Sequence, residues 1–200
     1  MSKITHFIQQ SWLLIVAAFF FGLLIAVTNA AWQPRIIQNE ENKLNNLMAG
    51  LITTAQKFEI AEKQIELTGE KGKIIKTDIY KALGADNKTL GFAFVASGPG
   101  FADKIKLVVA VNQNFENFFG FKVLASNETP GFGSKIKEEF FGNQFENAPA
   151  KKLILTKIGN EEQIDDQIVA ISGATVSSEA VVKIINNFIT QIKDKMQNKD

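Results

Sequence analysis

A long apolar run near the amino terminus constrains this chain more than any other feature. No charged residue occurs between Phe7 and Pro34, and residues 12–27 are almost entirely apolar. The stretch from Trp12 to Trp32 would span about 30 Å as a helix, at roughly 1.5 Å per residue, which is the thickness of a bilayer core. Tryptophans at both ends are typical of membrane interfaces. The run therefore predicts a transmembrane helix.

A cleaved signal peptide is the alternative, because a short basic start before an apolar run fits both, and residues 28–31 include small side chains. The run is longer than the apolar region of a usual signal peptide, which favours a retained anchor. We expect a cytoplasmic tail over residues 1–10 and a transmembrane helix over residues 11–32. The protein would cross the inner membrane once, with its carboxy-terminal domain on the periplasmic or extracytoplasmic side.

A second helical pattern follows Pro34, which we expect to end the anchor. Apolar residues recur there at spacings of three, four and seven: Ile37, Leu44, Leu47, Met48, Leu51, Ile52 and Ala55. The opposite face is polar. This pattern predicts an amphipathic helical stalk over residues 33–70, which packs one apolar stripe against the domain or a partner.

Composition excludes several kinds of site. The chain has no cysteine, so disulfides, iron–sulfur clusters, attached c-type haem and thiol catalysis are excluded. Its one histidine, His6, precedes the apolar run, which leaves no His-based triad and no His-rich zinc site. The 22 basic and 21 acidic residues nearly balance, which argues against a nucleic-acid partner. Any redox chemistry must come from an organic cofactor.

Residues 71–200 are predicted to form an α+β domain. β-type patterns occur at residues 74–75, 90–95, 105–111 and 118–125, and polar or glycine-containing turns separate them. Strands joined by short turns predict an antiparallel sheet rather than a doubly wound parallel one. A broad apolar face over residues 178–196 predicts a final helix that packs on this sheet, with Ser177 as its N-cap.

Two glycine-containing stretches are candidate binding loops. The first, Glu128-Thr129-Pro130-Gly131-Phe132-Gly133, follows a predicted strand, and Gly133 permits a close backbone approach. An ordinary surface turn would explain its Pro-Gly pair equally well. The second, Ser172-Gly173-Ala174-Thr175, opens the final helix, where free N–H groups and the helix dipole favour a phosphate. Ordinary capping by Ser and Thr is the alternative for this stretch.

The order of these pieces resembles a known family. A single anchor, Ser97-Gly98-Pro99-Gly100-Phe101 before an apolar strand, the Glu-Thr-Pro-Gly-Phe-Gly loop and the Ser-Gly-Ala-Thr motif occur in that order. The chain resembles the FMN-binding subunits of ion-translocating redox complexes, most closely the G subunit of the Rnf electron-transport complex. The C subunit of the sodium-translocating NADH:quinone reductase is a near relative, and the compact length favours the Rnf type.

The resemblance implies a covalent flavin. A separate flavin transferase outside the cytoplasm attaches FMN to the motif's threonine through a phosphoester bond, which here would be Thr175. Ser172, Gly173 and Ala174 match the recognition turn. The residues that match the loop beside the flavin are Glu128, Thr129, Gly131 and Gly133. In place of the loop's usual leucine, the chain has Phe132.

One position departs from the family pattern. The family usually has an aspartate three residues before the motif's Ser or Thr, and this chain has Val169 there. Asp165 and Asp166 lie slightly upstream and are the residues that could take its place. Of the properties that the resemblance implies, covalent attachment of the flavin is the one that this departure argues against.

The resulting hypothesis is a membrane-anchored flavoprotein that relays electrons between other membrane subunits of a redox complex. The chain has no Gly-x-Gly-x-x-Gly turn within a βαβ unit, which argues against hydride transfer from a bound nicotinamide. We therefore expect no catalytic residue or soluble substrate of its own, and no metal site. The alternatives are a membrane-tethered module that binds flavin or another ligand non-covalently, and a structural subunit without a redox role.

Overall fold

The structure of the protein is a computed structural model that describes residues 3–69 and 72–197. It divides into two compact units, one up to Lys43 and one from Leu44 onward. Each unit is described by itself below. The domain boundary that we expected between residues 70 and 71 lies outside the described residues, as do residues 1–2 of the expected tail.

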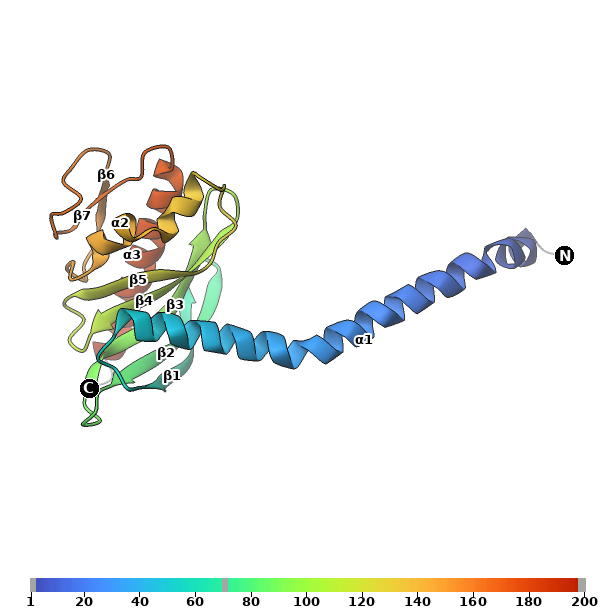
Figure 1. Cartoon of the computed structure of the whole chain (residues 1–200), viewed down its shortest axis with the longest axis horizontal. Coiled ribbons are helices and arrows are strands. Elements are labelled where there is room, and N and C mark those ends of the chain that lie inside the picture. Colours follow the sequence, from blue (N-terminus) through green and yellow to red (C-terminus); the bar gives the residue numbers. More distant parts are fainter. Residues whose placement is uncertain (1–2, 70–71, 198–200) are drawn as a thin grey trace. The chain divides into compact units, whose positions relative to one another are not determined.

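The first unit is a single helix, the greater part of α1 (Lys3–Leu51). Residues 3–10 of the expected tail are helical and continuous with it. The helix also continues through Pro34, where we expected it to end. A proline costs about 3 kcal/mol inside a helix, and α1 nevertheless runs unbroken across this position. Figure 1 shows that the helix is not straight.

The helix Ser11–Leu51 contains a segment long and apolar enough to cross a membrane, and the side chains of that segment are exposed. Its exposed apolar side chains include Leu14, Phe19, Phe21 and Ile25. A helical segment that is apolar all round and exposed fits a lipid environment. This helix indicates a single membrane anchor.

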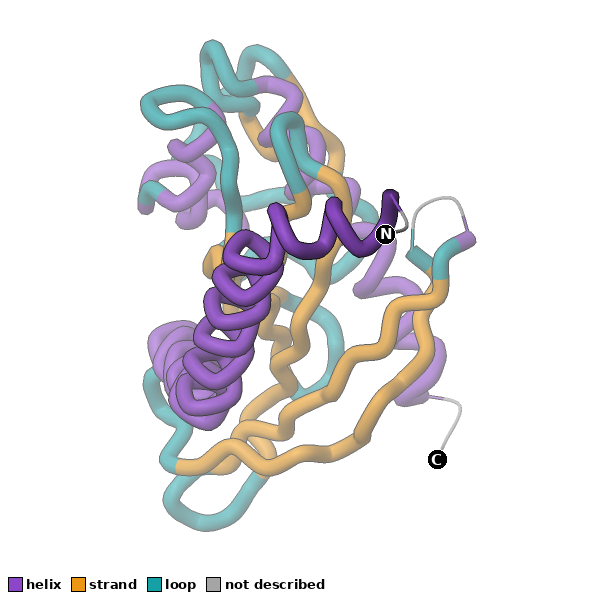
Figure 2. Tube along the Cα trace, turned by 90° about the vertical axis from the view of Figure 1, so that its right-hand side faces the viewer, coloured by secondary structure: helices purple, strands orange, loops and turns teal. Residues whose placement is uncertain are grey.

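The second unit is built on a five-stranded antiparallel sheet in the order β1-β2-β3-β4-β5. The strands are β1 (Lys57–Thr68), β2 (Ile74–Leu83), β3 (Thr89–Pro99), β4 (Lys104–Asn112) and β5 (Phe118–Ala125). They run past one another in one twisted layer (Figure 2). The α+β fold with an antiparallel sheet is thus confirmed, and β2 to β5 contain the four predicted strand segments.

Strand β1 differs from the sequence prediction, which extended a helical stalk to residue 70. The helix α1 ends at Leu51, and residues 57–68 pair with β2. Two register shifts interrupt that pairing, and Gln64 has a φ of 50°. Such bulges shift the side-chain alternation by a residue, so the strand lacks the clean period of two that would reveal it.

Helical segments cover both faces of the sheet within the second unit. The last turns of α1 place Met48, Leu51 and Ile52 against one face, with Ala93 and Val108 of the sheet. Helix α3 (Thr175–Gln197) packs on the opposite face (Figure 1), where the sheet contributes these buried side chains: Ile79, Phe94, Leu107, Val109 and Val111. Because it is buried on both faces, the centre of β4 is a continuous apolar run.

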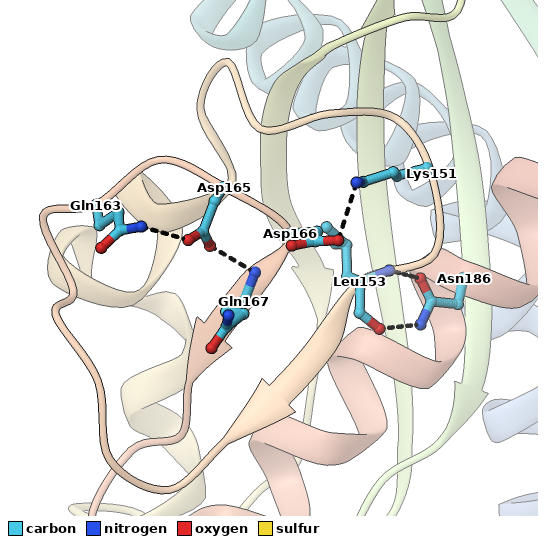
Figure 3. Close-up of polar contacts among 7 residues, drawn as sticks. All are labelled: Lys151, Leu153, Gln163, Asp165, Asp166, Gln167 and Asn186. Atoms are coloured by element: carbon cyan, nitrogen blue, oxygen red, sulfur yellow. Dashed lines mark hydrogen bonds and ion pairs between the residues drawn. The ribbon is translucent and has the colours of Figure 1, made fainter.

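Short elements connect β5 to α3. They are η2 (Gly133–Lys137), α2 (Glu139–Gly142), η3 (Asn143–Phe145), β6 (Ile154–Thr156) and β7 (Gln167–Val169). The two three-residue strands form a small parallel sheet that the sequence did not predict. The side-chain amide of Asn186 on α3 accepts from Leu153 N and donates to Leu153 O, both at 2.8 Å (Figure 3). These bonds tie the start of β6 to the final helix.

Candidate functional site

A cavity of about 430 Å³ lies where three segments meet at one end of the sheet. The segments are the loop between β3 and β4, the loop after β5, and the turn that opens α3 (Figure 1). The lining residues are Phe101, Thr129, Phe132, Gly133, Gly173, Ala174, Thr175, Val176 and Ser177. The two glycine-containing motifs of the sequence, far apart in the chain, therefore form one site.

Thr175 is the first residue of α3 and is half-buried in the cavity wall. The first hydrogen bond of the helix runs from Ser178 N to Ala174 O, at 2.9 Å. The backbone N–H groups of residues 175–177 consequently have no carbonyl partner within the helix. These three N–H groups and the positive end of the helix dipole lie at the start of α3, where Thr175 lines the cavity, and this is a favourable seat for an anion.

The turn before α3 is held by a buried hydroxyl. Ser178 is fully buried, and its Oγ accepts from Ile171 N at 3.1 Å and donates to Ala174 O at 3.0 Å. Gly173 takes a φ of 78°, which few other residues adopt without strain. Ala174 N closes the turn by donating to Ile171 O at 2.9 Å. The helix start is therefore fixed by hydrogen bonds within its own chain.

Ser177 is not the N-cap that the sequence predicted, because α3 begins two residues earlier, at Thr175. The position before Thr175 is Ala174, whose side chain cannot cap a helix. The Ser177 side chain is 2% exposed, and its Oγ donates to Glu128 Oε2 at 2.5 Å. This residue joins the first turn of α3 to the loop after β5.

Glu128 holds the three segments together. Its side chain is 5% exposed, and Oε1 accepts from Phe101 N at 2.9 Å and from Ala102 N at 3.0 Å. Both N–H groups belong to the loop between β3 and β4. With the Ser177 bond, one carboxylate thus receives donors from two segments and itself belongs to the third. Such charge-assisted bonds are stronger than bonds between neutral groups.

Two glycines leave the space that this carboxylate occupies. A Cβ on Gly100 would clash with Glu128 Oε1. A Cβ on Gly133 would lie 2.6 Å from Ser177 Oγ and 2.7 Å from Glu128 Oε2. The close approach predicted for Gly133 is therefore real, and the group that approaches is a carboxylate of the same chain.

The loop after β5 closes on itself around Gly131, which has a φ of 76°. Ser134 N donates to Thr129 O at 3.1 Å, and Gly131 N donates to Ser134 Oγ at 2.9 Å. These bonds present Thr129 and Phe132 to the cavity. The helical turn η2 follows directly and packs against the core through Ile136.

Apolar side chains stand around the cavity although they are open to solvent. Phe101 is 67% exposed, Phe132 is 58% exposed and Val176 is 52% exposed. The ring of Phe132 lies beside Gly173, where a Cβ would lie 3.4 Å from the ring. Exposed aromatic groups around a concave site commonly mark a binding site for an apolar ring.

The structure divides the predicted site residues into two groups. Thr129, Gly133, Gly173, Ala174 and Thr175 line the cavity. By contrast, Glu128 lies behind the wall, Gly131 shapes the loop and Ser172 is an exposed turn residue, and none of the three lines the cavity.

Sequence reasoning missed Phe101, Val176 and Ser177 as wall residues, and it noted Phe132 only as a replacement for leucine. Phe101 and Phe132 each follow a Pro-Gly pair. An apolar residue beside a tight turn is a signal that could have identified both.

Val169, where the resemblance led us to look for an aspartate, is buried in β7. The Gln144 side chain bonds its backbone in both directions, since Oε1 accepts from Val169 N at 2.7 Å and Nε2 donates to Val169 O at 3.2 Å. The Val169 side chain lies against Gly159, where a Cβ would lie 2.9 Å from it. The position is thus an apolar contact between β7 and the preceding loop.

Asp165 and Asp166 have local partners in the loop before β7 (Figure 3). Asp165 accepts from Gln167 N at 2.6 Å, and Asp166 pairs with Lys151 Nζ at 2.9 Å. The hydrogen bond from Lys151 holds the pKa of Asp166 below its usual value. Neither carboxylate lines the cavity that contains Thr175.

The donor set fits a ligand with two different ends. Free N–H groups and a hydroxyl suit a phosphate, while the exposed phenylalanines suit a flat aromatic ring. A flavin mononucleotide combines these two groups.

Comparison with known proteins finds a matching family model and several similar proteins. The FMN-binding domain family matches residues 100–190, which include both motifs. The G subunit of the proton-translocating ferredoxin:NAD(+) oxidoreductase complex of Clostridium ljungdahlii is 28% identical over 179 residues, covering 90% of this chain and 88% of the relative. The G subunit of the ion-translocating oxidoreductase complex of Methanosarcina acetivorans is 29% identical, with 88% and 87% covered.

Two solved structures share the fold. The crystal structure of Shewanella oneidensis NqrC has a TM-score of 0.53 and 19% identity, covering 71% of this chain and 73% of that one. The C subunit of the Na(+)-translocating NADH-quinone reductase of Parabacteroides distasonis has a TM-score of 0.56 and 16% identity, covering 80% and 95%. The resemblance inferred from the sequence is confirmed: to the Rnf-type G subunits in sequence, and to the quinone-reductase C subunits in fold.

Proposed function

We propose that this chain is the G subunit of an ion-translocating oxidoreductase complex of the Rnf type and passes electrons through FMN bound covalently to Thr175. The observation that carries this proposal is the position of Thr175. It borders a cavity at the open amino terminus of α3, beside three backbone N–H groups without helical partners. Similarity to G subunits over most of both chains supports membership in such a complex.

One set of residues in the site would hold the phosphate of the cofactor, and another set would contact its ring. The Thr175 oxygen would carry the phosphate as an ester, and the N–H groups of residues 175–177 would donate to its oxygens. Phe101 and Phe132 would provide apolar contacts for the ring and limit its exposure to water. When bound, FMN supplies the redox chemistry, and the protein supplies orientation and electrostatics.

The covalent bond would suit an electron relay, because a carrier fixed in one complex cannot diffuse away between electron transfers. Its partners would be the other membrane subunits of the complex, and a flavin transferase would be needed for maturation. We place the transmembrane segment at residues 11–32 of α1 and the flavin domain on the periplasmic or extracytoplasmic side of the inner membrane.

The test is fluorescence of the denatured protein. The full chain would be produced with and without a flavin transferase, and the denaturing gel would be viewed under ultraviolet light. We expect a fluorescent band only with the transferase, lost in Thr175→Ala and retained in Thr175→Ser. Thr190→Ala is the control, because this hydroxyl is exposed on the same helix and bonds only Asn186 O.

A band that persists in Thr175→Ala would show that another residue carries the flavin. Absence of the band from the wild-type chain, while the same transferase labels one of the related G subunits, would refute covalent attachment.

Non-covalent flavin binding is the second candidate, and Val169 is the observation that favours it. The family resemblance leads one to expect an aspartate at this position, and the structure has a buried apolar side chain there. Flavin that copurifies with the native chain and separates from it on denaturation would support this candidate.

A further inference from the structure

Glu128 is a buried carboxylate without a cationic partner. No lysine or arginine among the described residues pairs with it, and its three donors are two backbone N–H groups and one hydroxyl. All three donors are neutral, so the local negative charge is stabilised by hydrogen bonds but is not cancelled. Burial also separates it from the water and salt that screen exposed charges.

This charge lies directly behind the cavity wall. Phe101 and Ser177 line the cavity and donate to the carboxylate, while the Gly133 backbone lines the cavity and packs against it. A single layer of residues thus separates Glu128 from whatever the cavity holds. Across one layer of residues in a partly buried site, the charge of Glu128 changes the energy of a charge on the bound group. A redox titration can measure a change of this size.

We propose that Glu128 lowers the reduction potential of the flavin in this cavity. The inference rests on the proposed function, since it requires flavin at Thr175, but it concerns a residue that does not touch the cofactor. Reduction adds electrons to the flavin ring, and a fixed negative charge nearby makes that addition less favourable. Glu128 thus acts through the electric field of the site as well as through the contacts that build it.

Two substitutions test this inference, one at each partner of the hydrogen bond between Ser177 and Glu128. The inference predicts that they shift the reduction potential in opposite directions. Glu128→Gln keeps the shape and can still accept from the two N–H groups, but it removes the charge. It should raise the midpoint potential, and the reduced-to-oxidised ratio at a fixed poised potential should rise on the order of tenfold. Ser177→Ala keeps the charge and removes a donor that partly compensates it, so it should lower the potential.

A purely structural role predicts a different result. Both variants disturb the charge-assisted bond that Ser177 donates to Glu128, so loosening of the site would shift the potential in the same direction in both. The control is Asp103→Asn, which makes the same charge change in the loop between β3 and β4 but at an exposed carboxylate that accepts from Asn127. Water should screen that change, and the potential should stay near the wild-type value.

The potentials would be measured by spectroelectrochemistry on the flavin-loaded full chain at neutral pH, with loading checked by the fluorescent gel band. Shifts of the same sign in the two variants, or a Glu128→Gln shift no larger than that of Asp103→Asn, would overturn the inference. If Glu128→Gln does not fold, a Ser177→Ala potential at or above the wild-type value overturns it alone. A missing band in the wild type would instead refute covalent attachment.

Discussion

Replacing Gly133 with alanine would place a methyl group against the most tightly packed polar contact of the site. The new Cβ would lie 2.6 Å from Ser177 Oγ, 2.7 Å from Glu128 Oε2 and 3.0 Å from Glu128 Cβ. The first two distances are shorter than real Cβ contacts, so the Glu128–Ser177 hydrogen bond must lengthen or break. Both side chains are buried, and moving either one away from the new methyl group strains the hydrogen bond between them.

The cost combines two effects. Overpacking of a dense site typically costs about 1–3 kcal/mol. A weakened hydrogen bond to a charged group adds about 1.5–3 kcal/mol, of which the variant should lose only part. We expect the free energy of unfolding to fall by about 2–4 kcal/mol, which lowers the melting temperature by roughly 4–16 °C at about 2–4 °C per kcal/mol for a domain of this size.

The assay is thermal unfolding of the flavin-free full chain in detergent, followed by circular dichroism. Gly142→Ala is the matched control, because a Cβ there would meet nothing within 4 Å and the backbone is already helical. That variant should unfold at or slightly above the wild-type temperature, since alanine favours helices over glycine. If Gly133→Ala unfolds within about 1 °C of Gly142→Ala, the crowded carboxylate contact does not exist in solution.

Two further predictions concern stability away from the Glu128 contact. Ser178→Ala removes the hydroxyl that bonds the turn before α3 in both directions, so unfolding in urea should show a loss of about 2–4 kcal/mol, whereas Ser172→Ala at the exposed turn position should cost less than about 0.5 kcal/mol. Lys151→Met removes the partner that lowers the pKa of Asp166. A lowered folded pKa stabilises the protein above the unfolded pKa of about 4, and this gain is lost as pH falls through the folded value. The variant should therefore be less stable than wild type at pH 7 and equal to it in strong acid, and a difference that persists in acid would contradict the ion pair.

The sheet was largely predictable because most of its strands carry simple patterns. Residues 105–111 form an unbroken apolar run, and the segments at residues 90–95 and 118–125 are rich in phenylalanine and valine and end at clear turns. Strand β1 was missed because bulges near Glu62 and Gln64 shift its alternation. Strands β6 and β7 have three residues each, which is too short for any periodicity.

The sequence predicted that the two glycine motifs belong to one candidate site, but not which residues would line its cavity. Both glycine motifs do meet at one cavity, and Thr175 lies at the helix start that a bound phosphate requires. A linear motif does not tell which side of a cavity wall a side chain occupies. Glu128 was therefore predicted as a ligand contact, although it lies behind the wall and binds backbone N–H groups of a loop 26 and 27 residues away.

The carboxy-terminal end of α1 packs in the core of the domain. Met48, Leu51 and Ile52 are buried against the sheet, so the helix that begins in the apolar anchor ends as part of the domain core. A protease that releases an intact domain must cut before Leu44, because the side chains from Leu44 to Ile52 that pack on the sheet must stay with it. The last turns of α1 are therefore a condition of the domain's folding, and a chain cut too close to the sheet would leave an aggregation-prone remnant rather than a soluble domain.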